Sequence, residues 1–258
     1  MHNTDIAKTR VLATQGNADA QYELGEHYSH KQYKLEERYD PKNEELAIEW
    51  YRKAAEQGHV NAQYTLSHEV LSEMYCTEAE MEESNKWEHL AAEGGHPDAQ
   101  YSVGCDLFSG PFLGNPYRSP ASADYDNDKD NAEAVKLFIK SAKQGNIGAQ
   151  NALGNAYYYG NGVPQDYSLA FEWFQKSDSL FCLGEMYYYG YGVEKDEAEA
   201  VRCYRNNYSS CSESERRLEE IGWNCNLWKK AFGISKGDEE KAELLYAKLI
   251  SDSEVTDD

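Results

Sequence analysis

The sequence has few of the features that mark membrane, secreted or disordered proteins. No uninterrupted apolar run approaches the length of about 20 residues that spans a bilayer, and the first residues, MHNTDIAKTR, contain no apolar signal segment. Only 6 prolines occur among 258 residues, of which 40% are hydrophobic. This composition argues against a disordered or linker-dominated chain. We therefore expect a folded, cytoplasmic protein.

Cysteine is also sparse and scattered. The six cysteines are Cys76, Cys105, Cys182, Cys203, Cys211 and Cys225. They form no C-x-x-C pair and no dense framework of the kind found in small secreted domains. We expect free thiols, most of them buried.

The motifs of common enzyme classes are missing. The chain has no G-x-S-x-G, no P-loop, no Rossmann glycine fingerprint and no H-E-x-x-H. A catalytic site needs a nucleophile, a base and an oxyanion donor in one cleft, and no residue set here supplies them. The sequence predicts no enzyme, no catalytic residue, no cofactor and no metal.

Positive charge is in short supply. Lys and Arg number 25 against 46 Asp and Glu, which gives a formal net charge of −21 and a pI near 4.7. Such a field repels phosphate backbones and anionic lipids. The charge argues against direct nucleic-acid binding and, with no apolar span, we expect no membrane insertion. It favours encounter with a basic protein partner, although a merely solvated acidic surface explains it equally well.

What the sequence does contain is a repeat. QGNADAQYELG, residues 15–25, returns as QGHVNAQYTLS (57–67), GGHPDAQYSVG (94–104) and QGNIGAQNALG (144–154), and SLFCLGEMYYYG (179–190) keeps its end. A second block follows each copy, as in NEELAIEWYRKAAEQG (43–58), DNAEAVKLFIKSAKQG (130–145) and DYSLAFEWFQKS (166–177). Internal repeats of this length mark stacked supersecondary units.

Both blocks have the period of an amphipathic helix. Ala149, Leu153 and Tyr157 recur at i, i+4 and i+8, and Ala170, Trp173 and Phe174 form one apolar stripe. One helix pair cannot bury its stripe alone, so neighbouring pairs must stack. The sequence predicts an all-α fold, an α-solenoid of stacked antiparallel helix pairs. The expected N-caps of the second helices are Asn43, Asp130, Asp166, Asp196 and Asp238.

The combined pattern A-x-x-G-x-x-x-A-Q-x-x-L-G, Y-x-x-G-x-G-V-x-x-D and A-x-x-W-[FY]-x-K-A-A resembles the Sel1-like repeat, a relative of the tetratricopeptide repeat. The resemblance implies about five to six repeats in a single solenoid over residues 1–258. It also implies a degenerate C-terminal repeat at 209–250, followed by an acidic tail, 251–258, that we expect to be disordered. The repeat positions expected to be structural are Gly16, Gly25, Trp50, Gly58, Gly95, Gly104, Gly145, Gly154, Gly160, Gly162, Trp173, Gly184, Gly190 and Gly192.

Two inserts interrupt the pattern, at residues 29–42 and 109–130. The second contains a run of alternating aspartates, Asp124 to Asp130, that imitates the start of a calcium loop. Lys129 and Val135 replace the glycine and glutamate that such a loop requires, so calcium is disfavoured. A long loop in a compact repeat either contacts a partner or is a tolerated insertion. We prefer the first interpretation.

The turn sequence occurs twice, as AYYYGNGVPQD at 156–166 and MYYYGYGVEKD at 186–196. We interpret both as tight turns between helices rather than phosphate-binding loops. Their middle tyrosines lie one residue off the helical stripe, and so are candidates to face a partner. The predicted partner-binding residues are Tyr117, Asp124, Tyr125, Asp126, Asp128, Tyr158 and Tyr188.

Histidine offers little chemistry. His59 and His96 each follow a glycine that ends a helix, in the slot that Asn17 and Asn146 fill in other copies, and are expected to be turn residues. His27 and His30 could share one side of a helix end as metal ligands, but no further ligand cluster accompanies them.

The resemblance implies an adaptor or scaffold, since many Sel1-like proteins, a large number of them bacterial, serve in this way. The preferred interpretation is a non-enzymatic module that binds a basic protein through an acidic groove and the inserted loop. An alternative is a cytosolic immunity protein that neutralises a bacterial toxin or effector. A remote alternative is a secreted β-lactam-binding enzyme, because some cysteine-rich secreted members of the family are linked to β-lactam binding or hydrolysis. Those relatives have C-x7-C pairs that join successive helices. Only Cys203 and Cys211 have that spacing here, and Cys203 takes the slot of Trp173.

Overall fold

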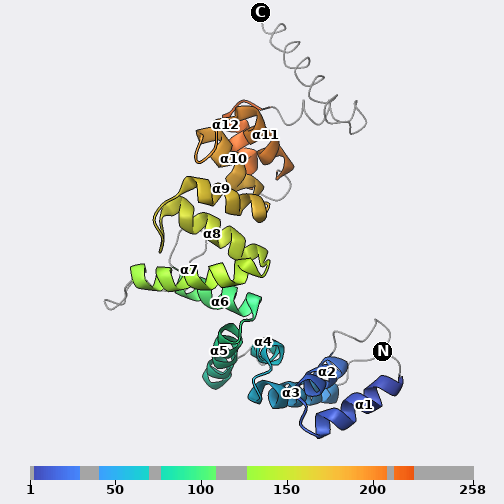
Figure 1. Ribbon diagram of the computed structural model, residues 1–258. Helices are drawn as coiled ribbons and strands as arrows, with labels where there is room; N and C mark the ends of the chain where they lie inside the picture. The colour runs from blue at the N-terminus through green and yellow to red at the C-terminus, as the bar shows by residue number, and fades with distance from the viewer. Residues whose placement is uncertain (1–2, 30–40, 70–76, 109–126, 208–211, 224–258) are drawn as a thin grey trace, which may run out of the picture. The chain divides into compact units, whose positions relative to one another are not determined.

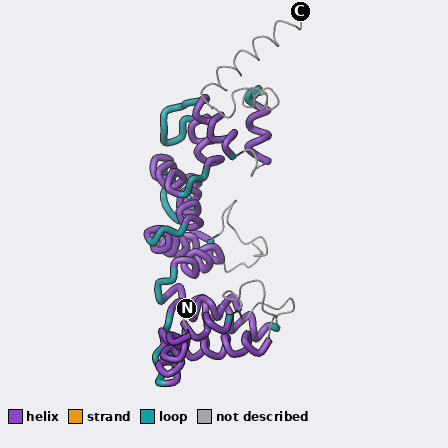
Figure 2. Tube along the Cα trace, turned by 90° about the vertical axis from the view of Figure 1, so that its right-hand side faces the viewer, coloured by secondary structure: helices purple, strands orange, loops and turns teal. Residues whose placement is uncertain are grey.

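The computed structural model describes residues 3–29, 41–69, 77–108, 127–207 and 212–223, which form helices joined by loops and turns (Figures 1 and 2). No strand occurs in these ranges. The helices are α1 (Asn3–Thr14), α2 (Ala18–Tyr28), α3 (Pro41–Glu56), α4 (Val60–Glu69), α5 (Glu78–Glu93), α6 (Pro97–Leu107), α7 (Asn127–Lys143), α8 (Ile147–Tyr159), α9 (Tyr167–Lys176), α10 (Leu180–Tyr189), α11 (Glu197–Asn206) and α12 (Ser212–Glu220).

The helices fall into two compact units, Met1–Asp166 and Tyr167–Asp258. Within each unit every helix packs against the next one in the chain, α1 to α8 in the first and α9 to α12 in the second. The predicted all-α fold, an α-solenoid of stacked helix pairs, is confirmed. One continuous stack over the whole chain stays a prediction, and the segments 224–258 and 109–126 lie outside the described residues. No described helix has the length and apolar character needed to cross a membrane.

In four of the five copies the first helix begins at a capping side chain on the residue after the glycine, and in the fifth Ser179 precedes α10 without a side-chain cap. Asn17 Oδ1 accepts from the Ala20 amide at 2.8 Å, and Asn146 Oδ1 accepts from that of Ala149 at 2.7 Å. In the other two copies an imidazole does the same, because the Nδ1 atoms of His59 and His96 accept amide hydrogens at 3.1 and 3.4 Å. The two histidines are therefore N-caps as well as turn residues.

The expected N-caps of the second helices are found in two copies and not in two others. Asp196 accepts from the Glu199 amide at 3.0 Å, as predicted, and Asp166 directly precedes α9. The cap predictions for Asn43 and Asp130 are wrong, because α3 begins earlier, at Pro41, and α7 at Asn127. Asp238 lies outside the described residues.

The glutamine of each A-Q pair connects consecutive hairpins. Gln21, Gln63 and Gln100 donate through Nε2 to the carbonyl oxygens of Ala13, Ala55 and Ala92, at 3.0, 3.1 and 3.1 Å. Those carbonyls lie in the last turn of the preceding helix, where each also accepts from the amide of the glycine just beyond the helix. The A-Q motif is therefore a buried hydrogen bond between repeats.

Three of the repeat glycines, Gly25, Gly104 and Gly184, let the next helix approach closely. The aromatic rings of the second helices, at Tyr51, Phe138, Phe174 and Tyr204, are at most 1% exposed. A Cβ atom added at Gly25 would lie 2.5 Å from the Tyr51 ring, and one at Gly104 would lie 2.6 Å from Phe138. Gly184 and Tyr204 repeat the arrangement at 2.5 Å. We call this pairing the glycine–ring contact.

The tryptophans occupy the position before the buried ring. Trp50 and Trp173 are only half-buried, and the ammonium groups of Lys53 and Lys176 lie 4.1 Å from their ring centroids. The core position expected at Trp173 belongs to its neighbour Phe174. The apolar stripe is wide enough to include both residues, and helix packing buries the second one.

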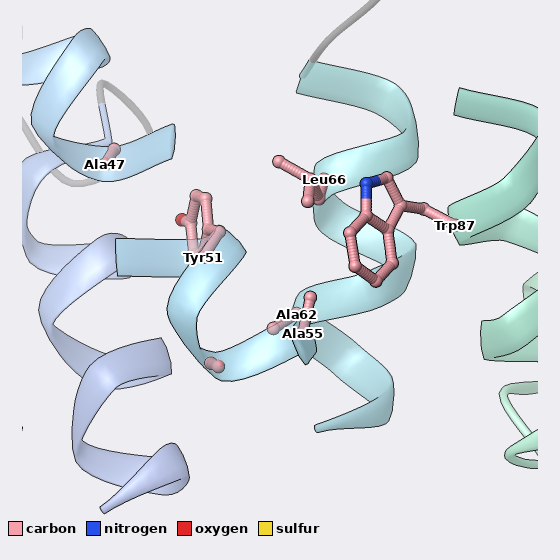
Figure 3. Packing of buried hydrophobic residues seen from close by; sticks show 7 residues of the cluster. Ala47, Tyr51, Ala55, Ala62, Leu66 and Trp87 are labelled. Carbon is pink, nitrogen blue, oxygen red and sulfur yellow. The ribbon is translucent and has the colours of Figure 1, made fainter. Parts of the chain in front are cut away.

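The α4–α5 pair lacks the glycine–ring contact. Ser67 replaces the glycine and Glu88 replaces the aromatic residue. Trp87 fills the interface instead, 7% exposed, and packs in one cluster with Leu66, Ala62 and Tyr51 (Figure 3). Ser84 Oγ donates to the Ser67 carbonyl at 2.7 Å, so the serines are satisfied within the interface.

Candidate protein-interaction surface

The two turns of identical pattern have the same backbone. Gly160 and Gly162 both have φ near +74°, and Gly190 and Gly192 have φ of +73° and +69°. The amide that ends each turn donates back to the first tyrosine of the triplet, Asp166 to Tyr157 and Asp196 to Tyr187, both at 2.9 Å. These sequences are helix-to-helix turns, as predicted.

The second glycine of each turn is pressed against the start of a neighbouring helix. A Cβ atom on Gly162 would overlap the carbonyl oxygen of Asn131, and one on Gly192 would overlap that of Tyr167. The residue between the two glycines is Asn161 in the first turn and Tyr191 in the second. Equivalent positions thus hold an asparagine pair in one unit and a tyrosine pair in the other.

The tyrosine triplets differ in exposure from the expectation. Tyr158 and Tyr188 are half-buried, and Tyr188 packs against the core formed by Ala200, Tyr204 and Leu218. The third tyrosines, Tyr159 and Tyr189, are the exposed ones, at 40% and 43%. The helical period therefore predicts the exposed ring at the second tyrosine, whereas the third tyrosine is the exposed one. A role for Tyr158 and Tyr188 in binding stays a prediction.

Three tyrosine rings of the second unit form a row. Tyr191 stacks on Tyr167 with a centroid distance of 4.7 Å and an interplanar angle of 10°, and on Tyr189 at 5.4 Å and 21°. We call Tyr167, Tyr189 and Tyr191 the tyrosine ladder. No pattern in the sequence indicates this contact, because Tyr167 begins α9 and Tyr191 lies in the turn after α10, so the two share no periodic stripe.

Cations already lie on rings at this end of the unit. The Arg217 guanidinium lies 5.7 Å from the centroid of Tyr189, and the Lys195 ammonium lies 5.6 Å from that of Tyr188. Both cations are paired with glutamates, Arg217 with Glu185 at 2.6 Å and Lys195 with Glu197 at 2.7 Å. The surface therefore combines aromatic rings and carboxylates around positive groups.

A buried network fixes Arg217 in place. Tyr204 donates its hydroxyl to Glu185 at 2.6 Å, and Arg217 also contacts Glu220 at 3.0 Å. Burial, followed by the hydrogen bond to Glu185, raises the pKa of Tyr204 well above its usual value. A small hollow beside this network is lined by Tyr188, Tyr204, Arg217, Glu220 and Ile221. It is a packed ion-pair network, and it has no nucleophile–base pair for catalysis.

The first two turns of α5 are acidic and exposed. Glu78, Glu80 and Glu82 all face solvent, and Met81 among them is 46% exposed. Glu80 closes a capping box with Thr77, and the Thr77 backbone amide is the main cause that lowers the pKa of its carboxyl. The three glutamates give the first two turns of α5 a negative, exposed surface.

Most of the predicted insert residues cannot be placed. Tyr117, Asp124, Tyr125 and Asp126 lie outside the described residues, and Asp128 lies in the first turn of α7. Elsewhere in the described ranges, no three or more His, Cys, Asp or Glu side chains are grouped as metal ligands. His27 lies beside the Tyr28 ring at 5.4 Å, and His30 falls outside the described part.

Cys105 and Cys203 are free thiols, as predicted. Burial raises the pKa of each thiol to about 11. Both are therefore protonated at neutral pH and are poor nucleophiles.

Comparison with known proteins places these features in a family context. The model of the Sel1 repeat matches residues 18–59, 128–146, 147–177 and 177–206. Residues 60–127, which contain α4, α5 and α6, are unmatched, and they include the α4–α5 interface in which Ser67 and Glu88 replace the shared residues. No curated protein sequence matches the chain.

Solved structures similar to the chain include proteins from Escherichia coli and Oxalobacter formigenes. The protective antigen c5321 of uropathogenic Escherichia coli, which displays an SLR fold, is 29% identical with a TM-score of 0.63. The match covers 95% of this chain but 48% of c5321, so the chain spans about half the length of that protein. A Sel1 repeat protein from Oxalobacter formigenes is 23% identical, with 93% and 89% coverage and a TM-score of 0.57, which supports the fold alone.

Proposed function

We propose that the chain, whose residues 18–59 and 128–206 match the Sel1 repeat, is a cytoplasmic adaptor that binds a basic protein partner. Proteins built from Sel1 repeats are generally non-enzymatic protein–protein interaction modules, which supports this role. Its repeat residues are used in stacking, and its exposed positions are rich in carboxylates. The net charge of −21 supports a cationic partner, whose approach the negative field would accelerate.

The observation that carries the proposal is the exposed acidic surface at the first two turns of α5. The shared repeat residues are lost at this helix pair, yet the fold is kept by Trp87, while Glu78, Glu80 and Glu82 stay exposed. In repeat proteins the positions that depart from the pattern commonly carry specificity. The inserted loop, with Tyr117 and Asp124 to Asp128, is the second proposed contact.

The test is affinity capture with the full chain from its native cells, followed by mass spectrometry at low and high salt. We expect a basic partner whose recovery falls steeply as salt rises. Changing Glu78 and Glu82 to Gln should reduce recovery, whereas the same change at Glu45 and Glu49, exposed carboxylates on α3, serves as the control. A partner that is acidic, or that is retained equally at all salt concentrations, would contradict the proposal.

The same experiment separates the adaptor from the immunity protein. A toxin-neutralising protein would yield one dominant partner with an activity of its own, and addition of the chain would inhibit that activity. An adaptor would yield a partner whose activity is unchanged. The strong acidity and the irregular repeats are the features that keep the second candidate in view.

A further inference from the structure

The two turns provide an internal control for what the fold requires. Their glycines have the same φ values and the same close approach to the neighbouring helix, whether the accompanying residues are Asn131 and Asn161 or Tyr167 and Tyr191. The backbone is therefore formed equally well without aromatic side chains. The tyrosine pair is an addition to the fold in the second unit, and it calls for an explanation other than folding.

The pair does not stand alone, because it continues the exposed ring of Tyr189. Tyr191 stacks on both other members of the tyrosine ladder, and Tyr189 is 43% exposed. Stacked rings keep few rotamers available, so the surface is pre-organised before any partner arrives. Rigid tyrosines with polar tips are the typical anchors of protein interfaces.

The electrostatics around the ladder select a cation. Residues 194–202 include four carboxylates, Glu194, Asp196, Glu197 and Glu199, and two cations, because Glu197 pairs with Lys195 and Glu199 with Arg202. Acidic groups therefore still exceed basic ones by two. The same surface already holds one guanidinium of its own, because Arg217 lies over the Tyr189 ring and pairs with Glu185. Ring and carboxylate together hold an arginine at this place within the chain.

We propose that the tyrosine ladder is a docking surface for an arginine-bearing segment of the protein partner, whose guanidinium groups stack on the rings beside the carboxylates of residues 194–199. Arginine fits better than lysine, since its planar guanidinium stacks on aromatic faces and binds carboxylates in a bidentate manner. The inference rests on the proposed function, because it assumes a basic protein partner, and it names the chemistry by which that partner is recognised.

The experiment uses the full chain and three labelled peptides of equal length, one with four arginines, one with four lysines at the same positions and one neutral. Binding is followed by fluorescence anisotropy at physiological salt. We expect the arginine peptide to bind about fivefold to tenfold more tightly than the lysine peptide, the equivalent of one well-formed cation–π contact. Both should bind more tightly than the neutral peptide.

The decisive variant is Tyr167→Asn with Tyr191→Asn, which installs the residues of the other turn. The preference for arginine should fall to less than about twofold, with an unchanged helical signal by circular dichroism. Tyr159→Asn is the matched control, because that ring is exposed to a similar degree (40%) and belongs to the other turn. It should keep the preference. Tyr191→Phe, which retains the ring, should keep it too, and guards against a general loss of fold in the asparagine variant.

The outcomes separate the two proposals. If the lysine and arginine peptides bind wild type equally, but better than the neutral peptide, the basic partner stands and the ladder is overturned. A preference that persists in the double asparagine variant also overturns the ladder. If neither cationic peptide binds better than the neutral one, the proposed basic partner fails, and the inference fails with it.

Discussion

The α2–α3 and α4–α5 helix pairs solve the same packing problem in two ways. In the first, Gly25 leaves room for the buried Tyr51 ring, whose hydroxyl donates to Glu26 at 2.7 Å. In the second, Ser67 closes that room, and Trp87 enters from the neighbouring position on the helix. Trp87 donates its indole hydrogen to Glu83 at 3.2 Å.

The difference shows that the glycine and the ring act as a pair. Gly25, Gly104 and Gly184 each face a buried aromatic ring, and the copy that lacks the glycine also lacks the ring. Either residue changed alone would leave a clash or a cavity, both of which are costly. A repeat that departs from the pattern must therefore change both the glycine and the aromatic residue, and another side chain must fill the interface.

The largest loss of stability should come from removing Trp87, which replaces the glycine–ring contact between α4 and α5. Trp87→Ala deletes the aromatic residue of the α4–α5 interface, so we expect a loss of about 3–5 kcal/mol in the free energy of unfolding. Urea denaturation followed by circular dichroism would measure it. An unchanged midpoint would mean that Trp87 does not replace the glycine–ring contact.

Closing the glycine pocket should cost somewhat less. Gly25→Ala places a methyl group 2.5 Å from the Tyr51 ring, and overpacking of this kind costs about 1–3 kcal/mol. Ser67→Ala at the equivalent position, where the Cβ is already accommodated, is the control and should cost less. Equal losses at the two sites would contradict the distinction between the interfaces.

The tryptophan slot provides the third comparison. Trp50→Ala removes a half-buried ring in contact with Lys53, so we expect a loss of about 1–2 kcal/mol, well below that for Trp87. Trp173→Ala should behave like Trp50→Ala, whereas Phe174→Ala should cost about 3–5 kcal/mol. Thermal unfolding of the three variants would rank them. A larger loss at Trp173 than at Phe174 would reverse the assignment of the core position.

The hydroxyl of Tyr51 should contribute less again. Tyr51→Phe keeps the ring in place and removes the hydrogen bond to Glu26, with an expected loss of about 1 kcal/mol. Tyr204→Phe removes the equivalent bond to Glu185 and provides an independent measurement in the second unit. A gain in stability for both variants would show that neither bond is favourable.

The smallest expected effect is the contribution of His96 to the pH dependence of stability. Burial lowers the pKa of His96, which stacks on Tyr64 at 4.0 Å and caps α6 through its unprotonated Nδ1. Because the folded state binds the proton less readily, this contribution is present above the ordinary histidine pKa and is lost as pH falls below it. Asp98 opposes the shift and His68 adds to it.

His96→Asn should therefore flatten the decline in stability between about pH 7 and about pH 5, by no more than the value of an N-cap, about 1 kcal/mol. Asparagine is the matched choice, because Asn17 and Asn146 cap the equivalent helices. Melting temperatures at the two pH values would measure the change. A steeper decline in the variant would contradict the role of the imidazole.

Much of this architecture can be read from the sequence. The 3.6-residue period and the recurring glycines predict the helix pairs, their stacking and the twin turns. The period cannot tell which of two adjacent apolar residues in the stripe, Trp173 or Phe174, is fully buried. It also cannot reveal contacts between residues far apart, such as the stack of Tyr191 on Tyr167 or the pairing of Gly25 with Tyr51. Those depend on how neighbouring helices meet.

The A-Q hydrogen bond has a consequence for engineering. Gln57 donates to Gln21, and Gln21 in turn donates to the carbonyl of Ala13, so the chain of amides ends on a main-chain oxygen of the preceding hairpin. A main-chain acceptor is available whatever side chain precedes it. This bond therefore does not require a particular side chain on the preceding helix. A hairpin could be placed after any helix whose last turn presents a carbonyl at the position of Ala13.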